Sequence, residues 1–129
     1  MNLSKHFTYD ELTTTNHREF DNTPNEAELE NLKRLANFLE EVKAVLYGKP
    51  IMVNSAFRSK SNSQHRVGCA ADIRVPGLTP NEVVKAIMDS DLPYDQLIRE
   101  FDRWTHLSIP NQPTDLPRKQ ALIIDKTGT

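Results

Sequence analysis

Residues 63–73 read SQHRVGCAADI, and the interpretation of the whole chain depends on this stretch. His65 and Asp72 are separated by six residues, and Gly68 between them allows a turn or a close approach of two backbone segments. The two alanines before Asp72 permit tight packing beside whatever the polar side chains face. A loop histidine followed by a carboxylate at the start of a strand can turn both side chains into one cleft.

A second histidine of interest lies in the segment WTHLS, residues 104–108. In an extended strand, His106 shares one face with Trp104 and Ser108, while Leu107 lies on the other face. His106 therefore points away from the apolar side of the strand. This placement is unusual for a core histidine and natural for a histidine of a functional site.

Two histidines and one carboxylate are a ligand set typical of catalytic zinc, because they leave a fourth tetrahedral position for water. The lone cysteine, Cys69, excludes an intramolecular disulfide and a cysteine-based zinc site. Glu100 and Asp102 lie six and four residues before His106, and either could act as a general base. Spacing alone leaves two alternatives open. One is that the histidines serve the structure or lie at the surface without a function, and the other is that the two carboxylates are solvated charges of a turn.

The composition of the 129-residue chain is that of a soluble globular protein, with 37% hydrophobic and 26% charged residues. We expect one domain over residues 1–129, with a core of about 6–109 and a C-terminal loop and possible edge strand at 110–129. The net charge of −2 argues against a nucleic-acid binder. We expect no membrane insertion, no signal peptide and a monomer, with His6 and His17 at the surface.

Three helices are predicted from capping signals and from apolar residues spaced three and four apart. Pro24 suits the first turn of the longest helix, which Gly48 and Pro50 end. Each helix is expected to start at a capping box, formed by Thr8 with Glu11, Thr23 with Glu26, and Thr79 with Glu82.

Short apolar runs predict the strands, and helices do not alternate with them regularly. The residue pair Asp102-Arg103 is expected to form a hairpin turn or a bulge between two strands; one continuous strand through it is the alternative. We therefore expect an α+β fold, with a small antiparallel sheet packed against helices on one side. The expected strands are 51–53, 70–75, 96–101, 104–109 and an edge strand at 121–124.

Three motifs, read in order, resemble the zinc D-alanyl-D-alanine peptidase family, which has the hedgehog/DD-peptidase fold. They are SAFRS at residues 55–59, SQHRVGCAADI at 63–73 and WTHLS at 104–108. The family pattern is S-x-x-R-S, S-x-H-x-x-G-x-A-x-D and a late W-x-H. The opening phrase FTYDEL, residues 7–12, looks like the start of small phage-borne members. The likeness covers roughly residues 6–109.

The resemblance implies a role for each residue that matches a motif. His65, Asp72 and His106 would hold one zinc ion. Arg58 would bind the carbonyl oxygen or a carboxylate of the substrate, a task that suits a planar and always charged donor. Ser63 would hydrogen-bond the substrate, and a hydroxyl that merely caps the loop is the alternative.

The chain departs from the family pattern at two positions before the last histidine. Some branches place an acid three residues before it, where this chain has Arg103. The hedgehog domain and small phage-type members have a glutamate six residues before it, which makes Glu100 the expected base and Asp102 the reserve. Many members have a histidine two residues before it, where Trp104 stands here and would line the substrate site.

The implied function is that of a zinc metallopeptidase that hydrolyses peptidoglycan stem peptides. It would be either a D-Ala-D-Ala carboxypeptidase or an L-Ala-D-Glu type murein endopeptidase, and loops 13–22 and 110–117 carry no pattern that distinguishes them. A non-catalytic zinc-binding module of the same fold and a metal-free α+β domain are the alternatives. Synthesis in the cytoplasm without a signal peptide would fit an endolysin encoded by a phage or prophage and acting on the cell wall.

Overall fold

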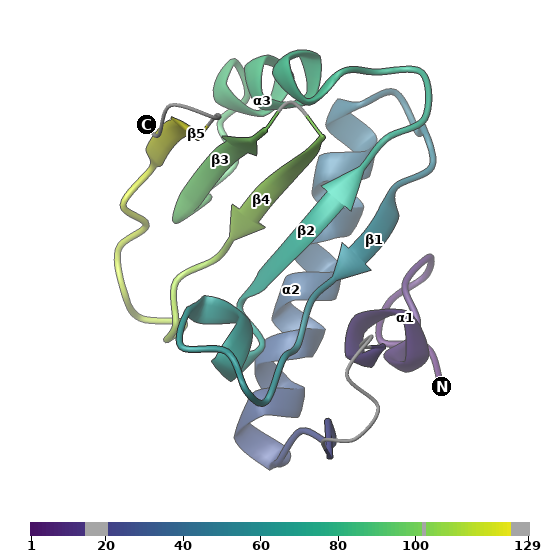
Figure 1. Ribbon diagram of the computed structural model, residues 1–129, viewed down its shortest axis with the longest axis vertical. Helices are drawn as coiled ribbons and strands as arrows, with labels where there is room; N and C mark the ends of the chain where they lie inside the picture. Colours follow the sequence, from purple (N-terminus) through teal and green to yellow (C-terminus); the bar gives the residue numbers. More distant parts are fainter. Residues whose placement is uncertain (15–20, 102, 125–129) are drawn as a thin grey trace.

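The computed structural model describes residues 1–14, 21–101 and 103–124, so His17 and Asp102 lie outside the described part. The described chain has the predicted α+β architecture (Figure 1). Its helices are α1 (Tyr9–Thr13), α2 (Glu26–Val45), the 3-10 helix η1 (Gln64–Val67) and α3 (Pro80–Met88). Its strands are β1 (Met52–Ser55), β2 (Ala70–Arg74), β3 (Gln96–Glu100), β4 (Trp104–Ser108) and β5 (Gln120–Ile124).

The strands form one mixed sheet in the order β1-β2-β4-β3-β5. The first three neighbouring pairs are antiparallel, as expected, but β5 lies parallel to β3, with Gln96 opposite Gln120. The expectation of a purely antiparallel sheet is therefore wrong at this edge. The reason is that β4 ends where β3 begins, and residues 109–119 bring the chain to the start of β3 before β5 forms.

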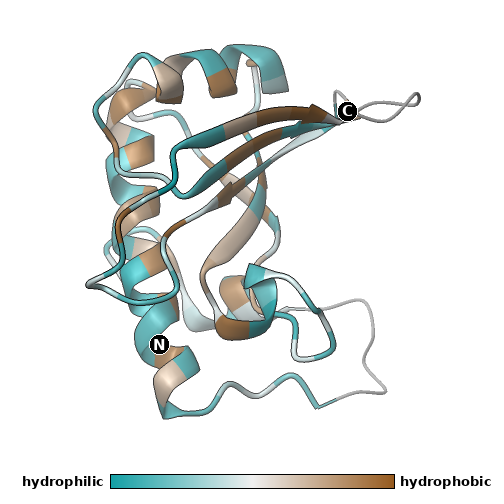
Figure 2. Cartoon of the chain, turned by 90° about the vertical axis from the view of Figure 1, so that its left-hand side faces the viewer, coloured by the Kyte–Doolittle hydropathy of each residue, from teal (hydrophilic) through white to brown (hydrophobic). Residues whose placement is uncertain are grey.

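The two faces of the sheet differ in character because side chains alternate along each strand. Ile73, Leu97 and Leu107 belong to the buried apolar core, which α2 and α3 complete on one face. Asp72 pairs with His106 and projects to the opposite face. Figure 1 shows α2 behind the sheet, and Figure 2 shows the same layers from the side. We call the face that bears Asp72 the open face.

The helix starts follow capping chemistry, with one shift from the expected position. The capping boxes of α1 and α3 form as predicted. The long helix begins later than expected, because Asn25 rather than Thr23 is its cap. The Asn25 side chain accepts from the backbone N–H of Glu28 at 2.8 Å, and Glu26 is the first helical residue. Asparagine ranks above threonine as a cap, which explains the choice.

A buried carboxylate fixes the segment after β4 against η1. Asp95 accepts hydrogen bonds from the backbone and side chain of Arg118 at 2.9 and 2.7 Å, and from the Gln64 amide at 3.0 Å. The same Gln64 amide donates to the carbonyl oxygen of Ile109 at 2.9 Å. These bonds hold the loop that precedes β5 next to the helix that carries His65.

Candidate metal centre

His65, Asp72 and His106 converge on the open face, from η1, β2 and β4 respectively. They are the group in the described residues that could hold a metal ion, and one ligand atom from each lies within 4.8 Å of the others. Asp72 Oδ1 is 3.4 Å from His65 Nε2 and 3.1 Å from His106 Nδ1. The three residues are only 1%, 8% and 6% exposed. The three residues that the motifs singled out as metal ligands therefore lie together in the folded chain.

The two ring nitrogens of His65 have different surroundings. Nδ1 lies 2.6 Å from the carbonyl oxygen of Ala56, so it carries the proton and donates it. Nε2 is buried, has no hydrogen-bond partner among the described residues, and faces Asp72. A buried nitrogen without a partner is rare, and this division of roles is typical of a metal-ligating histidine. The donor set therefore fits zinc.

Asp72 is ionised in this setting. Burial alone would raise the pKa of its carboxyl, but the hydrogen bond with His106 and the neighbouring His65 imidazole hold the pKa well below its usual range. The two imidazole rings meet edge to face, with centroids 5.0 Å apart. Two imidazole nitrogens and one carboxylate oxygen are a ligand set that a catalytic zinc ion accepts.

Gly68 sets the path of the chain between the first two ligands. It ends η1 in the left-handed conformation, with φ of 83°. A Cβ atom at this position would lie 2.8 Å from the carbonyl oxygen of Glu28 and 3.1 Å from Leu32 Cγ. Both roles expected of this glycine, a turn and a close backbone approach, are therefore confirmed, because η1 turns here against the backbone of α2.

Glu100 lies opposite Trp104 in the β3–β4 ladder, and Ile98 lies opposite His106. Glu100 is thus on the open face, one diagonal step from His106, a separation of about 7–8 Å. Its Oε2 accepts a hydrogen bond from the Trp104 indole at 3.1 Å. The indole orients the carboxylate that the sequence favours as the base, while the reserve candidate, Asp102, lies outside the described residues.

Arg58 and Ser63 both lie beside the first ligand. The backbone N–H of Arg58 donates to the carbonyl oxygen of His65 at 3.0 Å, and its buried Nε has no partner among the described residues. Ser63 caps η1, with its hydroxyl accepting from the backbone N–H of His65 at 3.3 Å. The structure thus shows Ser63 as a hydroxyl that caps the loop helix, which was the alternative to a substrate-binding role.

The family relationship rests on most of the chain. The family model for peptidase M15 matches residues 5–108. The chain belongs to the peptidase M15 family. This is the zinc D-Ala-D-Ala carboxypeptidase type of peptidase, so the resemblance drawn from the motifs is confirmed. A comparison with curated proteins finds no match.

Membership identifies this M15 peptidase as a zinc-dependent metallopeptidase, a hydrolase of a family that acts on cell-wall peptides. No helix in the described part of the chain is long and apolar enough to cross a bilayer. Cys69 stays outside the chemistry: it is buried in the core, and burial raises the pKa of its thiol to about 11. At neutral pH it is a protonated thiol, which does not ligate metal.

Two residues of the M15 peptidase site were missed in the sequence. Ala56 acts through its carbonyl oxygen, which any residue type supplies, so no side-chain pattern could reveal it. The role of Asp95 is visible only in the folded chain, because its hydrogen-bond partners Gln64 and Arg118 are 31 and 23 residues away in the sequence. Both residues position η1, and neither carries a motif of its own.

Proposed function

We propose that this M15 peptidase hydrolyses a peptide bond in peptidoglycan stem peptides, with one zinc ion held by His65, Asp72 and His106. The observation that carries the proposal is the buried His65 Nε2, unpartnered and 3.4 Å from the ionised Asp72. Bound zinc supplies a polarised scissile carbonyl and a water whose pKa is about 7.

Glu100 is the general base in this proposal. It lies on the same face as His106, and the Trp104 indole holds its carboxylate at 3.1 Å. The carboxylate takes the proton of the attacking water and delivers it to the leaving amine. The indole of Trp104 also forms one wall of the space in which the substrate lies.

Arg58 binds the substrate. Its backbone is hydrogen-bonded to that of His65, and its guanidinium has a buried Nε with no partner among the described residues. A cation beside the metal ligands stabilises negative charge that develops on the carbonyl oxygen. Ser63, exposed at the start of η1, can also donate its hydroxyl proton to the substrate while its oxygen caps the helix.

The proposal extends to where the enzyme acts and to its oligomeric state. We infer one catalytic domain that works as a monomer on the cell wall, with a stem peptide as its partner. Origin in a phage or prophage, and a role as an endolysin, are supported by the likeness of residues 7–12 to small phage-borne members. The proposed hydrolysis covers both possible reactions, that of a carboxypeptidase and that of an endopeptidase.

The first prediction tests the base. Glu100→Gln is expected to lower the release of new amines from purified sacculi by at least about 1,000-fold, because the proton acceptor is lost, while one zinc ion per chain remains bound. Activity and metal content are measured on the same preparation. Glu41→Gln, an exposed carboxylate on α2, is the matched control and should keep full activity.

Three outcomes would each contradict part of the proposal. Full activity of Glu100→Gln would remove this residue from the mechanism. Wild-type protein that holds one zinc ion but hydrolyses no wall fragment would favour the alternative of a non-catalytic zinc-binding module. Protein that takes up no zinc, with unchanged metal content in His106→Ala, would contradict the metal centre itself.

A further inference from the structure

The side chain of Asn22 is hydrogen-bonded to the backbone of two other segments. Its amide nitrogen donates to the carbonyl oxygens of Thr13 and Phe57, at 2.7 and 3.0 Å. Its amide oxygen accepts from the backbone N–H of Ser59 at 2.8 Å. Both protons of the amide and one lone pair of its oxygen are thus engaged, and only an amide side chain offers this combination.

Two of these partners belong to the peptide groups on either side of Arg58. The carbonyl of Phe57 shares one planar peptide group with the N–H of Arg58, and the N–H of Ser59 shares the next with the Arg58 carbonyl. The other end of each group is also held. The Arg58 N–H donates to the His65 carbonyl oxygen at 3.0 Å, and the Arg58 carbonyl oxygen accepts from the Ser61 N–H at 3.1 Å. Because the orientations of the two planes determine φ and ψ, these four hydrogen bonds fix the backbone of Arg58.

The direction of the Arg58 side chain depends on this backbone. Its guanidinium forms no hydrogen bond or ion pair with another described residue, and its buried Nε has no partner there. The rotamers that a side chain can adopt depend on φ and ψ. A change in either angle therefore turns the guanidinium, and no ion pair within the described residues opposes that turn.

The same segment carries the group that orients the first metal-ligand candidate. The carbonyl oxygen of Ala56 accepts from His65 Nδ1 at 2.6 Å, and Ala56 and Phe57 are fully buried. His65 also accepts from the Arg58 N–H through its own carbonyl oxygen. Neither of these bonds involves Asn22, so His65 keeps its own attachment to the segment. Asn22 bears on the residue beside the metal ligands and not on the ligands themselves.

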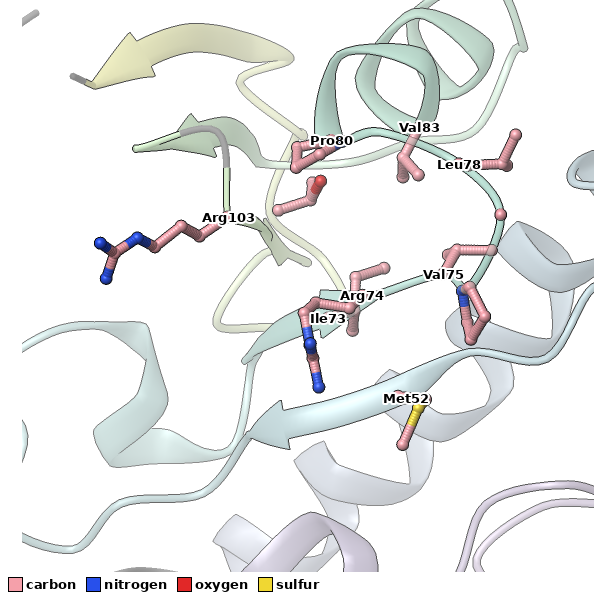
Figure 3. Close-up of a pocket in the computed structure, with 11 residues that line it drawn as sticks. Met52, Ile73, Arg74, Val75, Leu78, Pro80, Val83 and Arg103 are labelled. Carbon is pink, nitrogen blue, oxygen red and sulfur yellow. The ribbon is translucent and has the colours of Figure 1, made fainter.

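The apolar pocket of about 290 Å³ between the end of β2 and the start of α3 (Figure 3) takes no part in this support. Ile73 and Val83, which line it, belong to the core side of the sheet, opposite the face that bears Asp72. Neither Asn22 nor Arg58 is among its described lining residues. Arg58 is therefore held by backbone hydrogen bonds and not by the walls of this cavity.

We propose that Asn22 is a positioning residue of this peptidase, because it holds the two peptide groups that flank Arg58 and so aims the guanidinium at the substrate. The proposal rests on the proposed function, in which Arg58 binds the substrate. Asn22 acts only through the backbone of Arg58. Its contribution to catalysis therefore exists only while the guanidinium is present.

A double-mutant cycle tests this dependence with the zinc-loaded protein and the peptide L-Ala-γ-D-Glu-L-Lys-D-Ala-D-Ala, whose cleavage is followed by mass spectrometry. Asn22→Ala is expected to lower kcat/KM by about 100-fold, the effect of displacing a binding group by about 1 Å. In the Arg58→Gln background the same change should lower kcat/KM by less than about twofold, because no guanidinium is left to aim. Every variant should still bind one zinc ion, because the bond between Ala56 and His65 is intact.

Asn25→Ala is the matched control. It removes an amide from the same segment, but the Asn25 side chain caps α2 by accepting from the Glu28 N–H. It should lower Tm about as much as Asn22→Ala does and keep full kcat/KM. If Asn22→Ala does not fold, Asn22→Ser, whose hydroxyl keeps one donor, enters the same cycle with the same expected pattern.

Three results of the cycle would overturn the positioning role. The first is wild-type kcat/KM in Asn22→Ala. The second is an equal loss of kcat/KM in Asn25→Ala, which would show that lower stability alone is responsible. The third is a loss by Asn22→Ala that is as large in the Arg58→Gln background as in the wild type.

A measurement without turnover separates this proposal from the proposed function. The Nε–H signal of Arg58, identified by its absence from Arg58→Gln, reports the order of the guanidinium in nitrogen-15 NMR. We expect an order parameter of about 0.8 in the wild type and in Asn25→Ala, and below about 0.6 in Asn22→Ala. If this difference is seen but neither the peptide nor purified sacculi are hydrolysed, the proposed function fails and the positioning role stands. An equal order parameter and an unchanged chemical shift in all three proteins contradict the positioning role.

Discussion

Gly68 joins the first two metal-ligand candidates at a point where a side chain has no room. Its φ of 83° is costly for other residues, and its missing Cβ leaves space for the backbone of α2. The position of His65 therefore depends on a contact that His65 itself does not make.

Gly68→Ala is expected to lower the free energy of unfolding by about 3 kcal/mol, from left-handed strain together with the clash against Glu28. Gly48→Ala is the matched control, because Gly48 has a φ of 77° and open space around it. It should cost only about 1 kcal/mol. Urea unfolding measures both variants, and equal losses would show that the contact with α2 is unimportant.

At the scale of single residues, motifs predicted side chains well and backbone partners poorly. His65, Asp72 and His106 come together as the spacing indicated, because the alternation of β2 and β4 puts Asp72 and His106 on one face. The carbonyl oxygen of Ala56, which orients His65, could not be predicted, because a backbone group has no sequence signature.

Among the elements, the segment between β4 and β5 depends on one carboxylate. Asp95 is only 4% exposed and accepts from the backbone and side chain of Arg118. Burial alone would raise the pKa of Asp95, but hydrogen bonds from Arg118 and its charge lower the pKa below the ordinary value. The ionised form therefore stabilises the folded chain.

Asp95→Asn is expected to cost about 2 kcal/mol of unfolding free energy at pH 7. Because the folded-state pKa is the lower one, the contribution of Asp95 is fully present above the unfolded pKa of about 3.9 and is lost as pH falls further. The difference between wild type and variant should thus shrink below pH 4. Urea unfolding at pH 7, 4 and 3 measures it, with the exposed Asp91→Asn as control.

A constant difference between pH 7 and pH 3 would contradict this assignment. It would show that the variant acts through packing rather than through the charge of Asp95. Wild-type stability in Asp95→Asn at pH 7 would equally show that the ion pair with Arg118, whose side chain is 54% exposed, contributes nothing measurable.

Local sequence signals predicted the order and the type of the helices and strands. They did not predict the first residue of α2 or the direction of β5. Capping boxes placed α1 and α3 correctly, because the interactions span only three residues. Thr23 and Asn25 are both good caps, and the choice between them depends on which backbone turns first. The direction of β5 depends on Asp95 and the long return loop, which sequence alone does not reveal.

For the whole molecule, the metal centre and the apolar core lie on opposite faces of the sheet. Removal of zinc is therefore expected to lower Tm without unfolding the chain at 25 °C. At free zinc about 1,000 times its Kd, the ion contributes about 4 kcal/mol, or a Tm shift of about 10 °C for a chain of this size. Thermal melts with zinc and with EDTA, read by circular dichroism, measure the shift.

His106→Ala provides the control, since its Tm should not respond to zinc. Loss of helical signal in the wild type at 25 °C in EDTA would contradict the independence of core and metal centre. It would place this protein among the small domains that fold only when the metal is bound.

The division of the sheet into two faces also affects how the protein can change over time. Along β2 and β4, every second residue contributes to the core, and the residues between them face the substrate side. Substitutions on the open face alter chemistry and preference at little risk to folding. A lineage can therefore vary the residues of the open face, and with them its substrate, without first acquiring a more stable scaffold.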